Sequence, residues 1–147
     1  MREYLIITGA SRGIGKETAK LFAEAGWSVI NLSRTPCDLP NITNIPTDLS
    51  TSDWFKKIGP LLRESLSNPC KISVVHNAAL LNEKDKMDNI CSLSQEAFYE
   101  ILAVNLLAPI KLNQLLLPYM PKGSSIIYIG SVLSEKAIKN YTLRNIC

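Results

Sequence analysis

The first part of the chain joins a short apolar run to a longer stretch in which apolar and polar positions alternate at helical spacing. Residues 4–8 (YLIIT) are almost entirely apolar, which is typical of a strand buried on both faces. From Ile14 onward, apolar or small residues recur at positions 18, 21, 22 and 25, and charged residues occupy the opposite side. We therefore predict a strand at 4–8 and an amphipathic helix that Gly26 ends.

Strand-like and helix-like segments continue to alternate along the rest of the chain. Short β-branched runs predict strands, and longer stretches with one apolar face predict helices. A polar stretch at 80–93 predicts a loop on the substrate side of the fold. The further elements are strands at 27–32, near 41–48 and at 124–132, and a strand with the small-residue turn that ends it at 71–79. The predicted helices are one capped by Ser50 or Thr51 that runs to about Ser67, and one at 95–119 bent at Pro109.

This order of elements predicts an α/β fold. Strands separated by helical segments need right-handed crossovers, which give a mainly parallel sheet covered by helices on both faces. The length of 147 residues, 46% of them hydrophobic, suits one domain with its own core. We predict a single domain over residues 1–147.

The turn between the first strand and the first helix, TGASRGIG at 8–15, contains three glycines with separate uses. Gly9 lets the chain turn sharply, Gly13 lets the backbone approach a ligand, and Gly15 allows close packing of helix against strand. The exposed amide groups and the positive dipole end of the following helix then form a site for a pyrophosphate. The alternative is a glycine turn that serves packing alone.

Charge and cysteine content argue against several other classes of protein. The net charge of +3 is spread without a basic run, so nothing indicates a nucleic-acid partner. The four cysteines are far apart and only one histidine, His76, is present, which predicts neither a metal site nor disulfides. The first apolar run is too short for a signal or a membrane span, so we expect a soluble, cytoplasmic protein.

Several motifs together resemble the short-chain dehydrogenase/reductase family. The stretch at 8–15 is similar to the family's T-G-x-x-x-G-I-G cofactor motif, and HNAA at 76–79 is similar to its N-N-A-G turn. Asp48 and Leu49 stand where the family contacts adenine, Asn105 matches the asparagine of its water relay, and Ser131 matches its catalytic serine. The resemblance implies a Rossmann-type doubly wound sheet of about five strands in the order 3-2-1-4-5.

The resemblance also implies hydride transfer between a nicotinamide cofactor and a small carbonyl or alcohol substrate. The family forms homo-oligomers through helices such as that at 95–119. The catalytic residues carried over are Ser131 and Asn105. The residues expected to bind the cofactor are Gly9, Ser11, Arg12, Gly13, Ile14, Gly15, Arg34, Asp48, Leu49, Asn77, Ala78 and Ala79.

The choice of cofactor follows from charge. An NAD-selective fold carries an acid about twenty residues beyond its glycines, which accepts a hydrogen bond from the ribose 2′-hydroxyl. Ser33 and Arg34 occupy that place here, and Arg12 adds a second positive charge from the glycine turn. We therefore expect NADP(H) rather than NAD(H). Alternatively, the two arginines are ordinary surface residues.

Two other features also have a simpler reading. Residues 77–79 can be an ordinary turn, and His76 can be a packing residue.

The end of the chain departs from the family pattern. The family pairs a tyrosine with a lysine four residues later, which lowers the pKa of the phenol. Tyr141 fits this place poorly, and Asn145 stands four residues after it. We expect a domain truncated on its C-terminal side and inactive alone. Two hypotheses remain: an NADP(H)-dependent oxidoreductase, and a catalytically inactive remnant that binds the dinucleotide.

Overall fold

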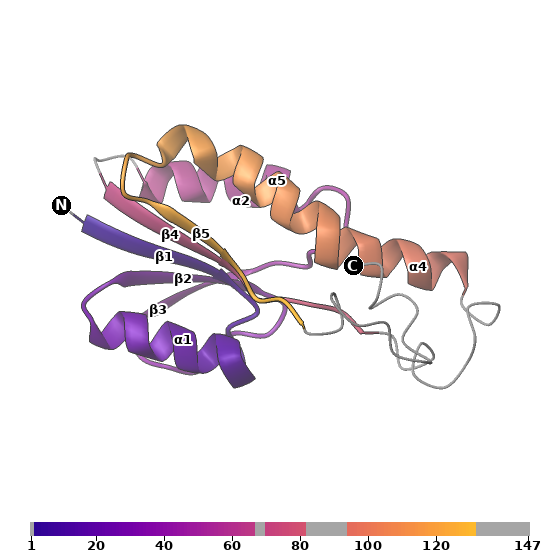
Figure 1. The fold of residues 1–147 in the computed structure, drawn as a ribbon, viewed down its shortest axis with the longest axis horizontal. Coiled ribbons are helices and arrows are strands. Elements are labelled where there is room, and N and C mark those ends of the chain that lie inside the picture. The colour runs from indigo at the N-terminus through magenta and orange to yellow at the C-terminus, as the bar shows by residue number, and fades with distance from the viewer. Residues whose placement is uncertain (1, 67–69, 82–93, 132–147) are drawn as a thin grey trace.

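Five parallel strands form one sheet in the order β3-β2-β1-β4-β5 (Figure 1). The computed structural model describes residues 2–66, 70–81 and 94–131. The sequence-based prediction of a parallel sheet in this order is confirmed. The strands are β1 (Arg2–Thr8), β2 (Ser28–Ser33), β3 (Ile42–Pro46), β4 (Cys70–His76) and β5 (Ser125–Tyr128).

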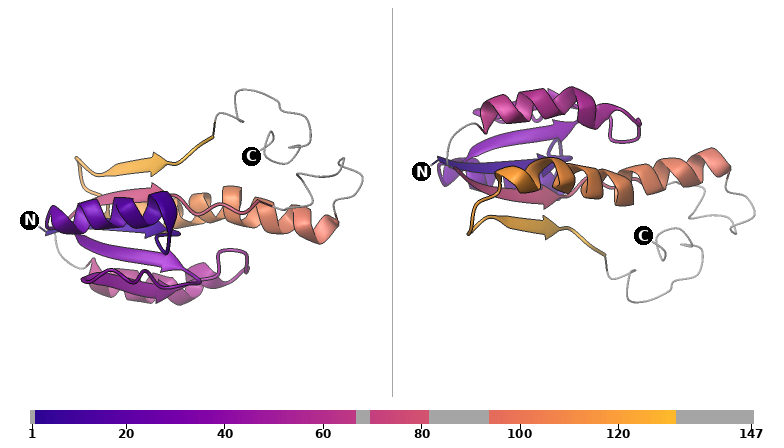
Figure 2. Two further views of the ribbon diagram at one scale, coloured as in Figure 1. Left: turned by 90° about the horizontal axis from the view of Figure 1, so that it is seen from below. Right: turned by 90° about the horizontal axis from the view of Figure 1, so that it is seen from above.

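Helices cover the sheet unevenly on its two faces (Figure 2). One face carries α1 (Gly13–Glu24), and the other carries α2 (Trp54–Ser65) and the long run that begins with α4 (Gln95–Leu102). That run continues through a π-helical turn (Ala103–Leu107), α5 (Ala108–Leu116) and a 3-10 turn (Leu117–Tyr119). Because α4 projects beyond the carboxyl ends of the strands, it reaches the edge of the sheet where ligands of such folds bind (Figure 1).

The core has two layers, which explains why the buried residues 4–7 of β1 are all apolar. Leu5 and Ile7 pack in the smaller cluster beneath α1, whereas Tyr4 and Ile6 pack in the larger cluster beneath α2 and α5. Alternate residues of a strand face opposite sides of the sheet, so a strand covered on both sides needs apolar residues throughout. Leu112 in α5 is fully buried in the larger cluster.

The long helix contains a π-helical turn directly before Pro109, where the sequence predicts a bend. Proline has no amide hydrogen, so the carbonyl of Asn105 cannot receive the bond that an α-helix would form four residues later. The wider turn at Ala103–Leu107 accommodates this, and the helix continues to Tyr119. The sequence locates the irregularity, but its form differs from the predicted bend.

In the part of the chain that the structure describes, one helical stretch is long and apolar enough to cross a membrane by length and composition. It is Gln95–Tyr119, of whose most apolar part 28% is buried. Core helices of water-soluble proteins meet the same criterion. Leu112 and Leu116 are both fully buried against the sheet, which accounts for part of this apolar character.

The start of α2 differs from the prediction. The sequence predicts Ser50 or Thr51 as the capping residue, but the N-cap is Asp53 and the helix begins at Trp54. Both hydroxyls are used in the preceding turn instead: Ser50 donates to the carboxylate of Asp48, and Thr51 donates to the Asp48 carbonyl. This turn therefore belongs to the carboxyl edge of the sheet.

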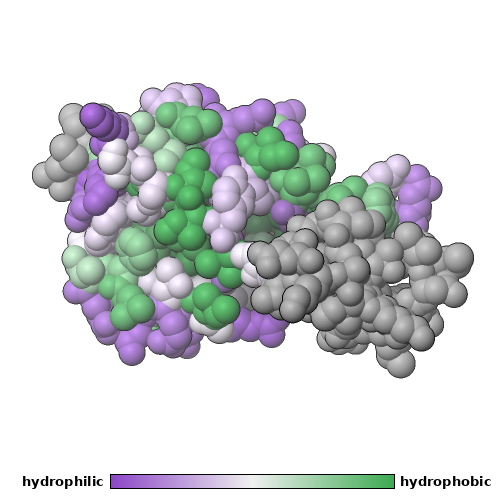
Figure 3. Space-filling model, in the orientation of Figure 1, coloured by the Kyte–Doolittle hydropathy of each residue, from purple (hydrophilic) through white to green (hydrophobic). Residues whose placement is uncertain are grey.

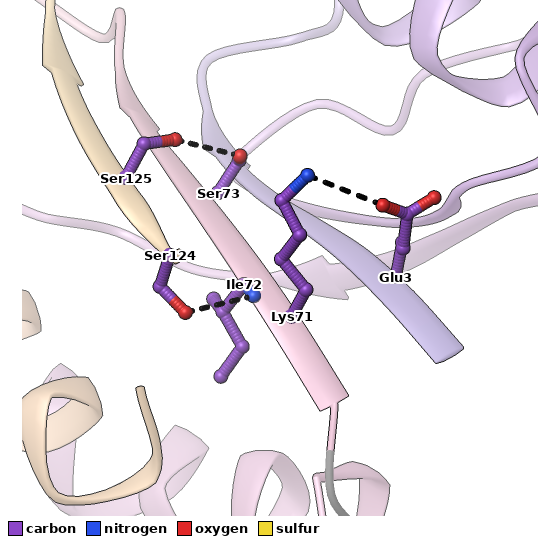
Figure 4. Close-up of polar contacts among 6 residues, drawn as sticks. All are labelled: Glu3, Lys71, Ile72, Ser73, Ser124 and Ser125. Carbon is purple, nitrogen blue, oxygen red and sulfur yellow. Dashed lines mark hydrogen bonds and ion pairs between the residues drawn. The ribbon is translucent and has the colours of Figure 1, made fainter. Parts of the chain in front are cut away.

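Polar contacts tie the amino-terminal ends of β1, β4 and β5 together (Figure 4). Lys71 forms an ion pair with Glu3 at 3.3 Å, and the hydroxyls of Ser73 and Ser125 are 2.7 Å apart. The Ser124 hydroxyl also accepts a hydrogen bond from the Ile72 amide at 3.2 Å. These contacts fix the register of β5 on β4, although within the described residues β5 has a neighbouring strand on one side only.

β5 is the edge strand of the described sheet, as its position in the predicted order requires. Figure 3 shows apolar surface along the course of β5. Ile127 is 42% exposed and Ile129 is 41% exposed, and apolar edge strands of this kind are open to pairing with further chain. β5 thus lies at the edge of the described sheet but has the apolar composition of an interior strand, as the sequence predicts.

His76, at the end of β4, is buried among polar and aromatic side chains. Its Nε2 lies 2.8 Å from Oδ1 of Asn113, and its ring stacks on Tyr128 with 4.7 Å between centroids. Asn113 donates to the Tyr128 hydroxyl, so the Asn113 oxygen accepts and Nε2 of His76 carries the proton. Nδ1 is then an acceptor without a partner among the described residues, and burial lowers the pKa of His76 despite the bond to Asn113.

The lowered pKa of His76 predicts a pH dependence of stability. In the unfolded chain an imidazole takes up a proton below about pH 6.5, whereas folded His76 resists protonation. We therefore expect the free energy of unfolding to fall as the pH drops from 7 to 5, by at most about 1.4 kcal/mol per pH unit. Urea titrations across this range measure the slope. His76 is the sole histidine, so His76→Asn serves as the control and should flatten the slope; equal slopes in both proteins would contradict the assignment.

Candidate functional site

A cleft of about 630 Å³ opens at the carboxyl ends of the first four strands. It lies where the chain leaves β1 for one side of the sheet and β4 for the other, which is the place where open α/β sheets bind ligands. Of the twelve residues that the sequence predicts for cofactor binding, eleven line this cleft and Gly15 lies behind it. The eleven are Gly9, Ser11, Arg12, Gly13, Ile14, Arg34, Asp48, Leu49, Asn77, Ala78 and Ala79.

The turn after β1 needs glycine for two different reasons. Gly9 and Gly13 have φ angles of +73° and +57°, which side chains other than glycine adopt with strain. A Cβ on Gly9 would also lie 3.0 Å from Cα of Ala78, so this glycine is enclosed by the turn after β4. A Cβ on Gly13 would meet nothing within 4 Å, because Gly13 faces the open cleft.

Gly15 permits the closest contact in the site. A Cβ there would lie 2.4 Å from both the Gly9 carbonyl oxygen and Nδ2 of Asn77. That Asn77 amide donates to the carbonyls of Gly9 at 2.9 Å and Thr8 at 3.2 Å. In return, the Thr8 hydroxyl oxygen accepts from the backbone amides of Asn77 and Ala78. We call these contacts the β1–β4 clasp; they join the two turns that form the cleft.

The N-terminus of α1 points its amide groups at the cleft. The N-cap is Arg12, in an extended conformation, and it makes no side-chain cap hydrogen bond. The first turn of α1 contains no acidic residue either. The first amides of a helix have no partner within the helix, so those of Gly13 and Ile14 remain available to an anion.

The turns after β2 and β3 form the other end of the cleft. Arg34 is exposed there beside Ser33 and Thr35. Asp48 accepts from the hydroxyl and the amide of Ser50, at 2.7 and 3.0 Å, and these bonds lower the pKa of its carboxyl group, with a smaller contribution from the charge of Arg34. Asp48 is therefore an ionised acceptor in the cleft at neutral pH.

The two residues predicted as catalytic lie outside the cleft lining. Asn105, in the π-helical turn, holds the backbone of Leu80: its oxygen accepts from the Leu80 amide at 2.7 Å and its nitrogen donates to the Leu80 carbonyl at 3.0 Å. Ser131 is exposed and follows the end of β5 by three residues, at the same edge of the sheet. Tyr141 and most of the loop predicted at 80–93 lie outside the described residues.

Sequence reasoning missed several residues that line the cleft. Glu100 and Val104 come from the long helix, four positions apart and therefore on one face, but their distance in sequence from the glycine turn gives no signal. The other six lie one or two positions along the chain from predicted residues. They are Leu32, Ser33, Thr35, Thr47, Ser50 and Leu80.

A sequence model of the short chain dehydrogenase family matches residues 3–143. The chain belongs to this family. Protein FixR of Bradyrhizobium diazoefficiens is 31% identical over 142 residues, which cover 90% of this chain and 51% of that protein. L-xylulose reductase of Mesocricetus auratus is 28% identical over 149 residues, covering 94% of this chain and 57% of that protein. The chain thus spans about half the length of these curated relatives.

Solved structures of the family have the same fold. An oxidoreductase of the short chain dehydrogenase/reductase family from Brucella ovis, in complex with a partially ordered NAD, matches with a TM-score of 0.83 at 28% identity. The match covers 99% of this chain and 73% of that one. A family member from Burkholderia vietnamiensis matches with a TM-score of 0.86 at 17% identity, over 97% of this chain and 69% of that one. At this low identity, the match to the Burkholderia vietnamiensis structure shows a shared fold only.

The β1–β4 clasp predicts that Gly15 tolerates no side chain. Gly15→Ala should lower the free energy of unfolding by about 1–3 kcal/mol, because the new methyl group overlaps a carbonyl and the Asn77 amide. Gly59→Ala is the matched control: its Cβ would have only an ordinary contact, 3.5 Å from Cδ1 of Leu115 in α5, and within α2 alanine favours the helix by up to about 1 kcal/mol. Urea unfolding of both variants measures the difference. Equal stability of the two would show that the clasp is not tightly packed.

Proposed function

We propose that the cleft binds NADP(H) and that the chain is the cofactor-binding part of an oxidoreductase acting on a small carbonyl or alcohol. The main support for this proposal is that an uncapped helix N-terminus and a glycine turn meet at the crossover point of the sheet. The pyrophosphate lies against the amides of Gly13 and Ile14. The adenosine half extends toward Asp48 and Leu49, beside Ala78 and Ala79.

The residues of the cleft fit such a group. Gly13 leaves open the space that a phosphate needs, since a Cβ there would meet no protein atom within 4 Å. Ser11 and Arg12 add donors beside the same turn. The cleft is also within the range of about 300–1,000 Å³ typical of ligand sites.

The preference for NADP(H) rests on the charge at the end of β2. Ser33 stands where an NAD-selective fold carries an acid, and Arg34 can present a guanidinium to a 2′-phosphate. The nearest acid along this connection, Asp38, pairs with Lys16 at 2.6 Å, and this ion pair lowers the pKa of Asp38 and offsets its charge. Arg12 supplies a second cation across the cleft.

In the oxidoreductase, the bound nicotinamide supplies or accepts the hydride. Ser131 would hold the substrate oxygen at the carboxyl edge of the sheet. Asn105, in the π-helical turn, would support the water relay that carries the proton, while its side chain fixes Leu80. We also propose a cytoplasmic homo-oligomer that uses the exposed apolar residues of the long helix, among them Leu107 and Ile110.

The second candidate function is a dinucleotide-binding module without catalysis. It is favoured by the sequence around Tyr141, which has the uncharged Asn145 four residues later. A phenol has a pKa near 10 and exchanges protons poorly at neutral pH without a cation beside it. The two candidates predict the same cofactor contacts and differ in turnover.

The cofactor proposal predicts tighter binding of NADPH than of NADH by calorimetry. Arg34→Ala should weaken NADPH binding about 10- to 100-fold, because charge-assisted hydrogen bonds contribute about 1.5–3 kcal/mol, and should leave NADH binding nearly unchanged. Arg63→Ala is the matched control, since Arg63 is exposed in the last turn of α2 and does not line the cleft. Equal affinity for the two coenzymes, unaffected by Arg34→Ala, would refute the preference.

Turnover by the 147-residue chain would exclude the second candidate, the module without catalysis. For the 147-residue chain alone we expect NADPH binding without measurable reduction of ketones or aldehydes, because the tyrosine lacks its lysine. NADPH oxidation with a panel of small carbonyl compounds measures this. Reduction that falls about 100-fold in Ser131→Ala, but not in the surface variant Ser65→Ala, would contradict the module and assign Ser131 to catalysis.

A further inference from the structure

The connection between β2 and β3 is unusually short for two parallel strands. It consists of residues 34–41, eight residues from the end of Ser33 to the start of Ile42, and contains no helix. Parallel neighbours usually need a crossover of about a dozen residues or more, most often a helix. A helix would satisfy its own backbone groups, whereas an extended connection needs other partners where it is buried.

Asn44, in β3, supplies those partners. Its Oδ1 accepts from the amide of Cys37 at 2.8 Å, and its Nδ2 donates to the carbonyl of Cys37 at 3.0 Å. Cys37 is only 3% exposed, so both of its backbone groups would otherwise be buried without a partner. The Asn44 side chain thus pairs with the connection as a neighbouring strand would.

Asn31, in β2, joins this pair to the glycine turn. It is 1% exposed and lies beside Asn44 in the strand register. Its Oδ1 accepts from the amide of Ala10 at 3.0 Å, and its Nδ2 donates to Oδ1 of Asn44 and to the Ser33 hydroxyl, both at 2.9 Å. Among the described residues, the three hydrogen bonds of this side chain therefore join the glycine turn at Ala10 to Ser33, at the end of β2, and to Asn44 in β3.

Arg34 lies between fixed points in this arrangement. The Ser33 hydroxyl, which accepts from Asn31, donates to the carbonyl of Thr35. Further along, Cys37 is held by Asn44, and Asp38 is held by Lys16 of α1. The backbone on either side of Arg34 is therefore tied to the strands, which limits the positions that its guanidinium can take.

We propose that Asn31 and Asn44 are positioning residues that hold the 2′-phosphate side of the cleft in register with the pyrophosphate side. This inference rests on the proposed binding of NADP(H). Asn44 acts through the connection that carries Arg34, so it governs the contact that NADPH makes and NADH does not. Asn31 contacts both the connection and the glycine turn, so it governs the binding of both coenzymes.

The two asparagines therefore have different expected effects. Asn44→Ala should weaken NADPH binding about tenfold and NADH binding less than about twofold, since it frees the connection but leaves the Ala10 amide paired. Asn31→Ala should weaken the binding of both coenzymes by a similar factor, because the glycine turn loses its anchor. For Asn44, a purely structural role would lower stability without changing the ratio of the two affinities. For Asn31, it would lower stability without weakening the binding of either coenzyme.

Calorimetric titration with NADPH and NADH tests this, with urea unfolding to establish that each variant is folded. Asn44→Thr is a second variant, suited to a strand but too short to reach both groups of Cys37. Asn113→Ala is the matched control: it removes two side-chain hydrogen bonds, against three for Asn44→Ala, at an asparagine that stands outside the cleft.

A preference for NADPH reduced at least about fivefold in both Asn44 variants, and kept in Asn113→Ala, would support the inference. If the wild-type protein prefers NADPH and the Asn44 variants retain that preference, the positioning role is overturned and the proposed cofactor preference stands. A wild-type protein that binds both coenzymes equally would instead overturn the proposed cofactor preference, and the positioning role with it.

Discussion

The β1–β4 clasp is the contact on which the site depends. The Asn77 side chain reaches the carbonyls of Thr8 and Gly9 only because Gly15 has no side chain in the way. This brings the turn after β4 against the turn after β1 and leaves the cleft between them and α1. Without that approach, the amides of α1 would still exist but would not face a pocket enclosed by a second turn.

Much of the fold follows from local patterns. The unbroken apolar run of β1 predicts a strand covered on both faces, and the observed alternation of Tyr4 and Ile6 with Leu5 and Ile7 between two core layers explains why no polar residue is tolerated. The glycine turn can also be predicted from the sequence, because each glycine meets a separate steric demand. These features depend on neighbouring residues and on strand order, which sequence periodicity captures.

Features that depend on contacts between distant segments could not be predicted in this way. Ser50 has the side chain of a helix cap, but its hydroxyl bonds to Asp48, so α2 begins later than predicted. Asn31 and Asn44 read as unremarkable polar positions within strands, and only the fold brings them together across β2 and β3. Polar residues in strands whose neighbours are buried are therefore worth examining as possible partners for short connections.

The account is tested most directly by amide NMR spectra of the 147-residue chain during titration with NADPH. It predicts that the amide signals of residues 11–14 shift most strongly, together with those of Asn77 and Arg34, because these groups line the cleft. Signals of α2, on the far side of the sheet from α1, should remain in place. Saturable shifts confined to other residues, with the amides at the start of α1 unmoved, would contradict the central claim that this helix N-terminus binds the dinucleotide.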